Sequence, residues 1–465
     1  MAGEASAVVD DKGWLYHPYF PDHWKRCPLY SLAQWVNGLA FRNIQFSDSG
    51  LPVIKIAEIK GGISGQTKFT QQTFDDAVRV RYGDLLFSWS GQPETSIDAF
   101  WWRDPEGWLN QHIFRVTPTE GIDPVFFYYL LRYLKPNFVG IARNKQTTGL
   151  GHITKRDLEN LEAAYPRLPE QRAIAHILGS LDDKIELNRQ MAQTLESIAR
   201  AIFKSWFVDF DPVKAKMEGK QPEGMSEEVA ALFPDKFVES ELGMIPEGWE
   251  AKPFGELLEH HIGGGWGKEK PDEKHTLPAH VIRGTDIPGA KKGIIDNVPL
   301  RYHTASNLKS RRLHAGDIVF EVSGGSKDQP VGRALLVNEA ILSALSGDTI
   351  CASFCKLMRP RNETVSSFML YLHIEEIYKN RRIMEYQTQS TGISNLKFSD
   401  FLNRDFVLVP VNGVRKAFDR HMVTLFDQMA GLGKQNWILR QIRETLLPQL
   451  ISGKIRLNQP EDAAA

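Results

Sequence analysis

At 465 residues the chain is too long for one ordinary hydrophobic core and predicts two or three domains. Its apolar share of 42% and charged share of 24% are those of a soluble globular protein, and no run approaches the roughly 18 apolar residues of a membrane span. The net charge of −1 does not point to nucleic acid, but residues 279–320 carry seven basic and three acidic side chains. Three cysteines and the absence of a signal peptide predict a cytoplasmic protein without a disulfide framework.

An internal repeat governs the organisation of the chain. PDHWKRCPLYSL from Pro21 resembles PEGWEAKPFGEL from Pro246, and GDLLFSWSG from Gly83 resembles GDIVFEVSG from Gly316. TTG from Thr147 matches STG from position 390. The order is kept while the offset grows from 225 to 243, so small insertions separate two copies of one module.

Each copy reads as a β-rich domain followed by a long helix. Short apolar runs bounded by Gly, Pro, Asn and Asp predict strands and turns. The expected order is an N-terminal tail (1–20), a first domain (21–168), a central helix (169–210), an acidic linker (211–245), a second domain (246–412), a second helix (413–457) and a C-terminal tail (458–465).

Both long helices carry apolar residues at alternating steps of four and three, the spacing of a coiled coil. The alternative is a plain amphipathic helix packed on its own domain, but the pattern recurs in both copies. One asparagine in each seam is expected to fix register, and Gly431 and Gly433 predict a break in the second helix. The seam residues are Leu178, Leu181, Ile185, Asn188, Leu195, Ile202, Met422, Leu425, Met429, Leu432, Asn436, Leu439 and Leu446.

Chain order favours antiparallel pairing of the helices, because parallel pairing needs a long connection and residues 211–245 are short and irregular. The predicted fold is therefore α+β, with two β-rich domains separated by two long antiparallel helices in a coiled coil with a pseudo-twofold internal repeat. A helix of about 35 residues is roughly 50 Å long, and one turn of B-DNA advances about 34–36 Å. Two unlike domains at opposite ends of such a rod fit a bipartite, asymmetric DNA target.

This arrangement resembles the specificity subunits of Type I restriction–modification enzymes over almost the whole chain. RLPEQRAIAHILGSLDDKIELNRQ resembles the start of the family's central helix, and TLLPQLISGKIRL resembles the end of its C-terminal helix. TTGLGHITKRDL and STGISNLKFSD resemble the loop that closes each recognition domain. One departure is VPVNGVRKAF, which lacks the usual PEQ and leaves the start of the second helix undefined.

The resemblance implies that the two β-rich domains are target-recognition domains for double-stranded DNA. It also implies a complex with two DNA adenine methyltransferase subunits and, for cleavage, two ATP-driven restriction subunits. Those partners are expected to use S-adenosylmethionine, ATP and Mg²⁺, with no cofactor in this chain. The exposed sides of the helices are the expected docking platform.

The sequence offers no catalytic motif, so the chain is expected not to be an enzyme. GGGWGKEK from Gly263 has neither the spacing nor the hydroxyl residue of a phosphate-binding loop. Cys351 and Cys355 lack the further ligands of a zinc site and are expected to be buried. No metal site is expected.

Polar and basic residues in the domain loops are the candidates for DNA contact, because Arg and Lys bind guanine edges and Asn and Gln bind adenine. Any one of them is equally well an ordinary solvated side chain. The candidates for base contact are Ser88, Ser90, Gln92, Arg143, Asn144, Lys145, Gln146, Thr147, Thr148, Ser323, Ser326, Lys327, Arg333, Gln387, Gln389, Ser390 and Thr391. The candidates for phosphate contact are Lys291, Lys292, Arg311, Arg312, Arg381 and Arg382.

Two other functions remain open at this point. A stand-alone DNA-binding regulator with duplicated reading domains would bind a specific site tightly without partners. A catalytic DNA-modifying enzyme would transfer methyl groups or cleave DNA by itself. The recognised bases do not follow from the sequence.

Overall fold

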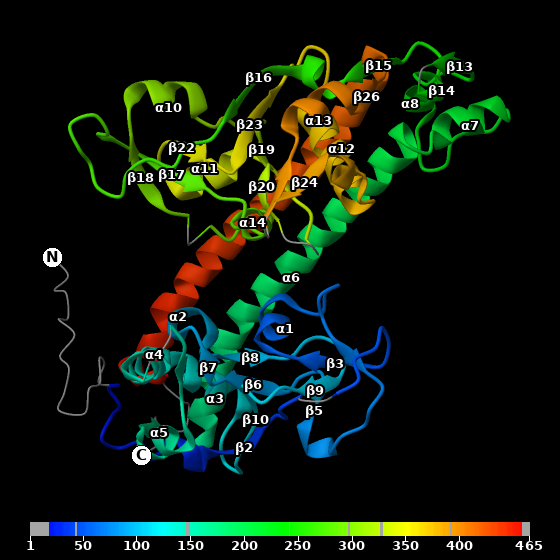
Figure 1. Cartoon of the computed structure of the whole chain (residues 1–465). Coiled ribbons are helices and arrows are strands. Elements are labelled where there is room, and N and C mark those ends of the chain that lie inside the picture. The colour runs from blue at the N-terminus through cyan, green and yellow to red at the C-terminus, as the bar shows by residue number, and fades with distance from the viewer. Residues whose placement is uncertain are drawn as a thin grey trace. The chain divides into compact units, whose positions relative to one another are not determined.

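The computed structural model describes residues 18–41, 44–145, 149–240, 242–295, 298–325, 329–390 and 393–457 (Figure 1). The chain divides into two compact units, Met1–Asp183 with Arg440–Ala465, and Lys184–Leu439. Each unit combines one β-rich domain with a stretch of both long helices, α6 (Leu168–Phe207) and α14 (Asn412–Ile451). The predicted α+β class is confirmed.

The first domain is built on a four-stranded antiparallel sheet in the order β2-β10-β6-β8. A second sheet has the order β4-β3-β9-β5, with β3 and β9 parallel, and β1 pairs with β12 immediately before α6. The strands are β1 (Lys25–Pro28), β2 (Ala33–Asn37), β3 (Leu51–Ile54), β4 (Phe69–Thr70), β5 (Arg79–Val80), β6 (Leu85–Ser88), β7 (Ser90–Gly91), β8 (Asp98–Trp101), β9 (Gly107–Leu109), β10 (Ile113–Pro118), β11 (Gly151–His152) and β12 (Glu162–Tyr165). The helices are α1 (Ile56–Gly61), α2 (Pro93–Ser96), α3 (Pro124–Tyr133), α4 (Lys135–Asn144) and α5 (Lys155–Asn160).

The second domain is built on an antiparallel sheet in the order β16-β23-β19-β21. Beside it are the sheet β18-β17-β22, with β17 and β22 parallel, the sheet β20-β25-β24, and the pair β15-β26. The strands are β15 (Glu250–Pro253), β16 (Leu258–Gly263), β17 (Leu277–Ile282), β18 (Leu300–His303), β19 (Ile318–Glu321), β20 (Ser323–Gly325), β21 (Ala334–Leu336), β22 (Thr349–Cys351), β23 (Cys355–Pro360), β24 (Gln387–Ser390), β25 (Ile393–Leu396) and β26 (Phe406–Val409). The helices are α9 (Ile287–Ala290), α10 (Ala305–Arg311), α11 (Glu339–Leu345), α12 (Ser367–Lys379) and α13 (Phe398–Arg404).

The two domains repeat one topology. In each central sheet the strand after the first 3₁₀ turn (β2 or β16) forms one edge, and the strand after the Gly-Asp turn (β6 or β19) is internal. The second strand after it in the chain (β8 or β21) forms the other edge. In each domain the first strand pairs with the last one before the long helix, which is β1 with β12 and β15 with β26. The internal repeat predicted from sequence is therefore a structural repeat.

The long helices pair antiparallel. In the second unit, the Asn188 side chain of α6 donates a hydrogen bond to Asn436 of α14 at 3.0 Å, and Phe203 lies 6.2 Å from Phe418 between ring centroids. The contact on α14 therefore moves toward the N-terminus as α6 proceeds toward its C-terminus. In the first unit, Arg443 of α14 binds Asp182 of α6. All thirteen predicted seam side chains are buried or half-buried, and none is exposed.

Each domain shares its hydrophobic core with the helix pair of its own unit. In the first unit, Ile174 and Leu178 of α6 and Leu450 of α14 are buried together with residues of β6, β10 and α3. In the second unit, Phe203 of α6 and Phe418 of α14 are buried with residues of β19, β23 and α12. Burial of each such side chain contributes about 1.5–3 kcal/mol, so the helices are integral to both folds.

Both long helices begin at equivalent positions by different local contacts. The fully buried Gln171 accepts a hydrogen bond from the Asp123 backbone and donates to the carbonyls of Gly121 and Pro166. Its counterpart in α14 is Arg415, which donates to the Asn362 carbonyl at 2.6 Å. In α14 the basic Arg415 thus takes the place of the glutamine of the PEQ motif. The two helices are equally long, with 40 residues each.

Two predictions about irregular segments need revision. The expected break at Gly431 and Gly433 is wrong, because α14 continues through both residues. A Cβ atom on the loop residue Gly293 (φ +71°) would lie 3.0 Å from the Gly433 Cα, so this loop packs closely on the helix backbone. The segment 211–245, expected as a linker, contains α7 (Asp211–Met217), α8 (Glu227–Ala231), β13 (Phe237–Ser240) and β14 (Gly243–Pro246).

Within the described part of the chain, no helix combines the length and the apolar character that crossing a membrane requires.

Candidate nucleic-acid interface

In the first domain, candidate residues gather where α2, α4, β7 and β11 pack together. Gln92 is exposed at the N-cap of α2, and Arg143 and Asn144 are exposed at the C-terminal end of α4. The Arg143 guanidinium donates to Glu94 at 2.5 Å. Hydrogen bonds from the Glu94 backbone and from Arg143 lower the pKa of this carboxyl group. The geometry presents donors and acceptors on one exposed edge.

Ser88 and Lys145 do not belong to that edge. Ser88 is fully buried in β6, where its hydroxyl donates to the Ser90 carbonyl at 3.5 Å, so its predicted base contact is wrong. Ser90 is half-buried in β7. The Lys145 ammonium donates to both carboxylate oxygens of Asp157 at 2.5 Å. Burial would raise the pKa of Asp157, but hydrogen bonds from Lys145 and Thr154 lower it, so Lys145 anchors α4 to α5 rather than reaching DNA.

Several candidates cannot be placed. The residues outside the described part of the chain are Gln146, Thr147, Thr148, Ser326, Lys327 and Thr391. The side chains of Gln389 and Ser390 also lie outside it, although their backbone forms β24.

In the second domain, the sheet β20-β25-β24 corresponds to β7-β11 of the first. The Ser323 hydroxyl hydrogen-bonds the Asn395 amide oxygen at 2.6 Å, and the Gln387 amide donates to the Val331 carbonyl at 3.2 Å. Sequence reasoning missed Asn395 and the exposed Thr388, both on this sheet. The signal was the polar run that continues past the STG motif into β25.

Phe354 was also missed. It is 64% exposed, and its carbonyl accepts a hydrogen bond from the Val322 backbone beside β20. A phenylalanine without apolar cover beside polar strand ends is a suitable surface for stacking. An apolar residue inside the turn CASFCK was the available signal.

Three predicted cationic contacts in the second domain are instead internal ion pairs. Arg333 binds Glu321, which is 2% exposed, through two hydrogen bonds. These hydrogen bonds raise the pKa of Arg333 against the opposing effect of burial. Lys291 binds the buried Glu375 at 2.6 Å. A side chain that neutralises a buried carboxylate cannot leave it without exposing an uncompensated charge, so neither cation is available to DNA.

Arg382 is the third such cation. It donates to the buried Asp405 at 2.8 Å, and the same carboxylate contacts His373 at 2.5 Å and the Tyr386 hydroxyl at 3.3 Å. Burial would raise the pKa of Asp405, but His373, Arg382 and Tyr386 together lower it. This network fixes α12, the turn after it and α13 to one another.

The remaining predicted phosphate contacts differ in availability. Arg311 is half-buried and donates to the Gly263 carbonyl at 2.8 Å, whereas the exposed Arg312 pairs with Asp348 at the same distance. Lys292 and Arg381 are exposed, and neither makes a salt bridge to any residue that the structure describes. These last two are the cations best placed to meet a phosphate.

Burial keeps the two cysteines of the second domain in their protonated, less reactive form. Cys351 and Cys355 are buried, and burial raises the pKa of the Cys351 thiol to about 12 and that of Cys355 upward as well. Thiols that stay protonated are poor nucleophiles and poor metal ligands. Among the described residues no group of three His, Cys, Asp or Glu side chains is arranged to hold a metal ion.

The known proteins that this chain resembles are specificity subunits of Type I restriction enzymes. Residues 21–197 match the family model of the Type I restriction modification DNA specificity domain. The chain is 26% identical over 422 residues to the Type I restriction enzyme HindI specificity subunit of Haemophilus influenzae, covering 81% of this chain and 87% of the relative. It is 24% identical over 361 residues to the MjaIX specificity subunit of Methanocaldococcus jannaschii, covering 75% and 73%.

A solved S subunit of a Type I restriction–modification system from M. genitalium aligns over 94% of this chain and 97% of its own length, with 14% identity and a TM-score of 0.47. The family match lies on the first domain and α6, and the curated relatives extend over most of the chain. Residues 21–197 thus match a Type I restriction modification DNA specificity domain, and most of the chain is similar to Type I restriction enzyme specificity subunits.

Proposed function

We propose that this chain reads a bipartite, asymmetric double-stranded DNA target and docks methyltransferase and restriction subunits onto itself. The observation that carries the proposal is a repeated topology with unlike polar surfaces. Both domains have the same strand order, yet one presents Gln92, Arg143 and Asn144 and the other Ser323 and Asn395. Different side chains on one scaffold are what two different half-targets require.

In the first domain the proposed readers are Arg143 and Gln92. An arginine pairs with the guanine edge in the major groove, and a glutamine or asparagine pairs with adenine. Glu94 holds Arg143 in the free protein, so binding a base exchanges this exposed ion pair for a base contact. In the second domain Lys292 and Arg381 are the proposed phosphate contacts, which position a protein without specifying sequence.

The helices are the proposed spacer between the two half-targets. Each long helix has 40 residues, which corresponds to about 60 Å at 1.5 Å per residue. A turn of B-DNA advances about 34–36 Å, so helices of this length suit half-targets between one and two turns apart. Insertion of four residues would lengthen a helix by about 6 Å and widen the unread gap by one or two base pairs.

Exposed apolar residues on the helices support docking of two similar partners. Ile198 of α6 and Ile442 of α14 are 42% and 41% exposed. The two isoleucines occupy the same position when each helix is counted from its first residue. Equivalent apolar side chains in both copies suit two copies of one partner, which we propose to be the adenine methyltransferase subunit. We also propose two restriction subunits, with S-adenosylmethionine, ATP and Mg²⁺ used by the partners.

The test is methylation-sensitive sequencing of a host that carries this chain and its methyltransferase. A bipartite, asymmetric methylated motif is expected, and replacing residues 21–168 by the corresponding domain of another subunit should change only one half of the motif. Arg143→Ala should relax one position of the first half, whereas the matched control Lys155→Ala, on the exposed face of α5, should leave the motif unchanged.

Two outcomes would contradict the proposal. Methylation that does not depend on this chain would remove its role in target choice. Tight, specific DNA binding by the isolated chain, with no effect of a methyltransferase on affinity or modification, would favour a stand-alone regulator.

A further inference from the structure

In each unit one domain helix rests on the long-helix pair. These helices are α3, capped by Asp123, and α12, capped by Ser366. Arg132 and Glu375 lie at the same distance along the chain from the respective cap, so they occupy the same position in the repeat. The repeat thus places opposite charges at one site of its two copies.

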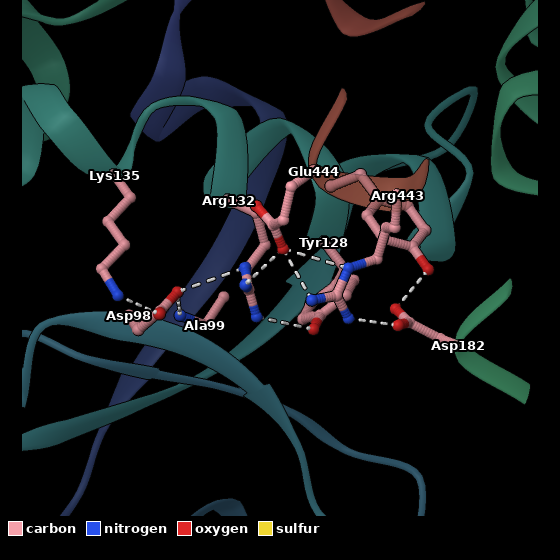
Figure 2. A network of polar contacts seen from close by, with 9 residues as sticks. Asp98, Ala99, Tyr128, Arg132, Lys135, Asp182, Arg443 and Glu444 are labelled. Carbon is pink, nitrogen blue, oxygen red and sulfur yellow. Dashed lines mark hydrogen bonds and ion pairs between the residues drawn. The ribbon is translucent and has the colours of Figure 1, made fainter. Parts of the chain in front are cut away.

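In the first unit the domain supplies the cation (Figure 2). Arg132 lies 3.9 Å from the Glu444 carboxylate of α14, 3.8 Å from Asp98, and 3.2 Å from the Tyr128 hydroxyl. Burial would lower the pKa of Arg132, but Tyr128, Asp98 and Glu444 raise it. The guanidinium is therefore a permanent positive charge beside the acidic Glu444.

Beside this pair lies a second polar contact in the same unit. Asp182 of α6 accepts a hydrogen bond from Arg443 of α14 (Figure 2). It accepts another, at 2.6 Å, from the Tyr129 hydroxyl of α3. Arg443 also donates to Glu444 at 2.6 Å. The domain, α6 and α14 are thus joined through one network.

In the second unit the domain supplies the anion. Glu375 accepts hydrogen bonds at 2.6 Å from Arg200 of α6 and from Lys291 of its own domain. Its side chain is only 6% exposed. The neighbouring contact is apolar, since Phe426 of α14 packs against Phe368 and Tyr371 with ring centroids 4.9 and 5.9 Å apart.

The helix residues of the two networks are also equivalent. When α6 is counted from Leu168 and α14 from Asn412, Arg200 and Glu444 occupy the same position. By the same count, Ala199 in α6 corresponds to Arg443 in α14 and Asp182 in α6 to Phe426 in α14. The two docking sites therefore differ in charge sign at two matched positions (Arg132 and Glu375, Arg200 and Glu444) and in polarity at two more (Ala199 and Arg443, Asp182 and Phe426).

The seam asparagines break the repeat in a similar way. By the same count, Asn188 of α6 corresponds to Leu432 of α14, and Asn436 lies about one helical turn further along. In the antiparallel α6–α14 pair the two asparagines meet at 3.0 Å. An antiparallel pair of two α6 helices in the same register would place Asn188 against Ala192 and bury an amide without a partner.

We propose that these differences make α6 pair selectively with α14. They exclude pairing of either helix with the same helix of a second copy of the chain. In an α6–α6 pair, Arg132 would meet Arg200 of the other copy. In an α14–α14 pair, Glu375 would meet Glu444. Each self-pairing would replace the opposite charge on the long helix by a like charge beside a buried ionised side chain, which is destabilising, so both self-pairings are disfavoured. This selective pairing does not depend on what the domains bind. Its consequence is that each molecule contains one copy of each domain that reads a half-target, and this consequence rests on the proposed function.

The test exchanges the matched residues of α6 and α14 that contact the domains, in the full chain. The variant Ala199→Arg, Arg200→Glu, Arg443→Ala, Glu444→Arg places like charges at both domain contacts. Its melting temperature should fall by about 5–10 °C, and the backbone amides of α3 and α12 should exchange hydrogen at least about tenfold faster. Light scattering should also detect dimers, because after the exchange an α6–α6 or α14–α14 pair brings opposite charges together at Arg132 and Glu375.

A rescue variant distinguishes an effect of charge complementarity from a general loss of stability caused by the four substitutions. Adding Arg132→Glu and Glu375→Arg restores opposite charges at both contacts and should recover at least about half of the lost protection, although Asp98 and Lys291 oppose full recovery. The control exchanges two exposed equivalent residues, Lys184→Gln with Gln428→Lys, and should change nothing. Unchanged stability and mass in the exchange variant would overturn the proposal, as would a rescue variant no better than the exchange variant, including the case in which neither folds.

Discussion

The Asn188–Asn436 pair offers the sharpest test of the helix pairing. Asn188 is fully buried, and its amide donates to Asn436 at 3.0 Å and to Gln435 at 3.2 Å. Asn188→Leu leaves Asn436 buried and without this donor. The orphaned amide costs about 1–3 kcal/mol, and burial of the new leucine contributes about 1.5–3 kcal/mol. The single variant should therefore stay near the parent in stability.

The double variant Asn188→Leu, Asn436→Leu buries two leucines and orphans no amide. Because each single change orphans one amide, the double variant should be more stable than the sum of the two single changes by about 2–6 kcal/mol. Urea unfolding followed by far-ultraviolet circular dichroism on all four proteins measures this interaction energy. Gln435→Ala is the control, because Gln435 is exposed and should matter by less than about 0.5 kcal/mol.

An interaction energy within about 0.5 kcal/mol of zero would refute the reasoning, since it would mean that the two amides do not depend on each other. The double variant also loses the asparagine pair that favours pairing of α6 with α14. Light scattering should therefore detect more self-association in the double variant than in the parent.

Three further predictions concern residues outside the seam. Gly431→Ala should raise stability by about 1 kcal/mol, because Gly431 is helical and an added Cβ meets nothing within 4 Å; a fall in the urea midpoint would contradict this. Arg333→Ala should cost about 3–5 kcal/mol by orphaning Glu321, while the methylated motif of the surviving protein stays the same; a relaxed motif would make Arg333 a DNA reader after all. The lowered pKa of Asp405 beside His373 contributes stability that is present above the ordinary Asp range near pH 4 and lost as the pH falls through the lowered pKa, so the acid side of the stability profile should flatten in Asp405→Asn.

Patterns repeated along the chain were sufficient to predict the architecture. The seam period places Leu178 and Met422 inside the helix pair, and both are fully buried. The matched segments around Gly83 and Gly316 predict equivalent strands, which are β6 and β19. These features depend on neighbours within one or two helical turns or one strand, so local periodicity determines them.

The candidate site was less accessible to sequence reasoning. Lys145, Lys291 and Arg333 have the composition of DNA contacts, but each neutralises a carboxylate in its own domain. Their partners lie 12 residues away in two cases and 84 in the third, across turns and sheet edges. Asn395, which sequence reasoning missed, reaches its partner Ser323 because β20 pairs with β25.

The sequence by itself determined that two copies of one module each precede a long heptad helix, and that each seam contains one asparagine. Only the tertiary structure decided which charges are already paired, that α14 continues through its glycines, and that Arg132 and Glu375 occupy one position with opposite signs. The physical reason is range. Hydrophobic periodicity is a property of neighbouring residues, whereas the state of a charge depends on whichever groups the folded chain brings within a few ångströms.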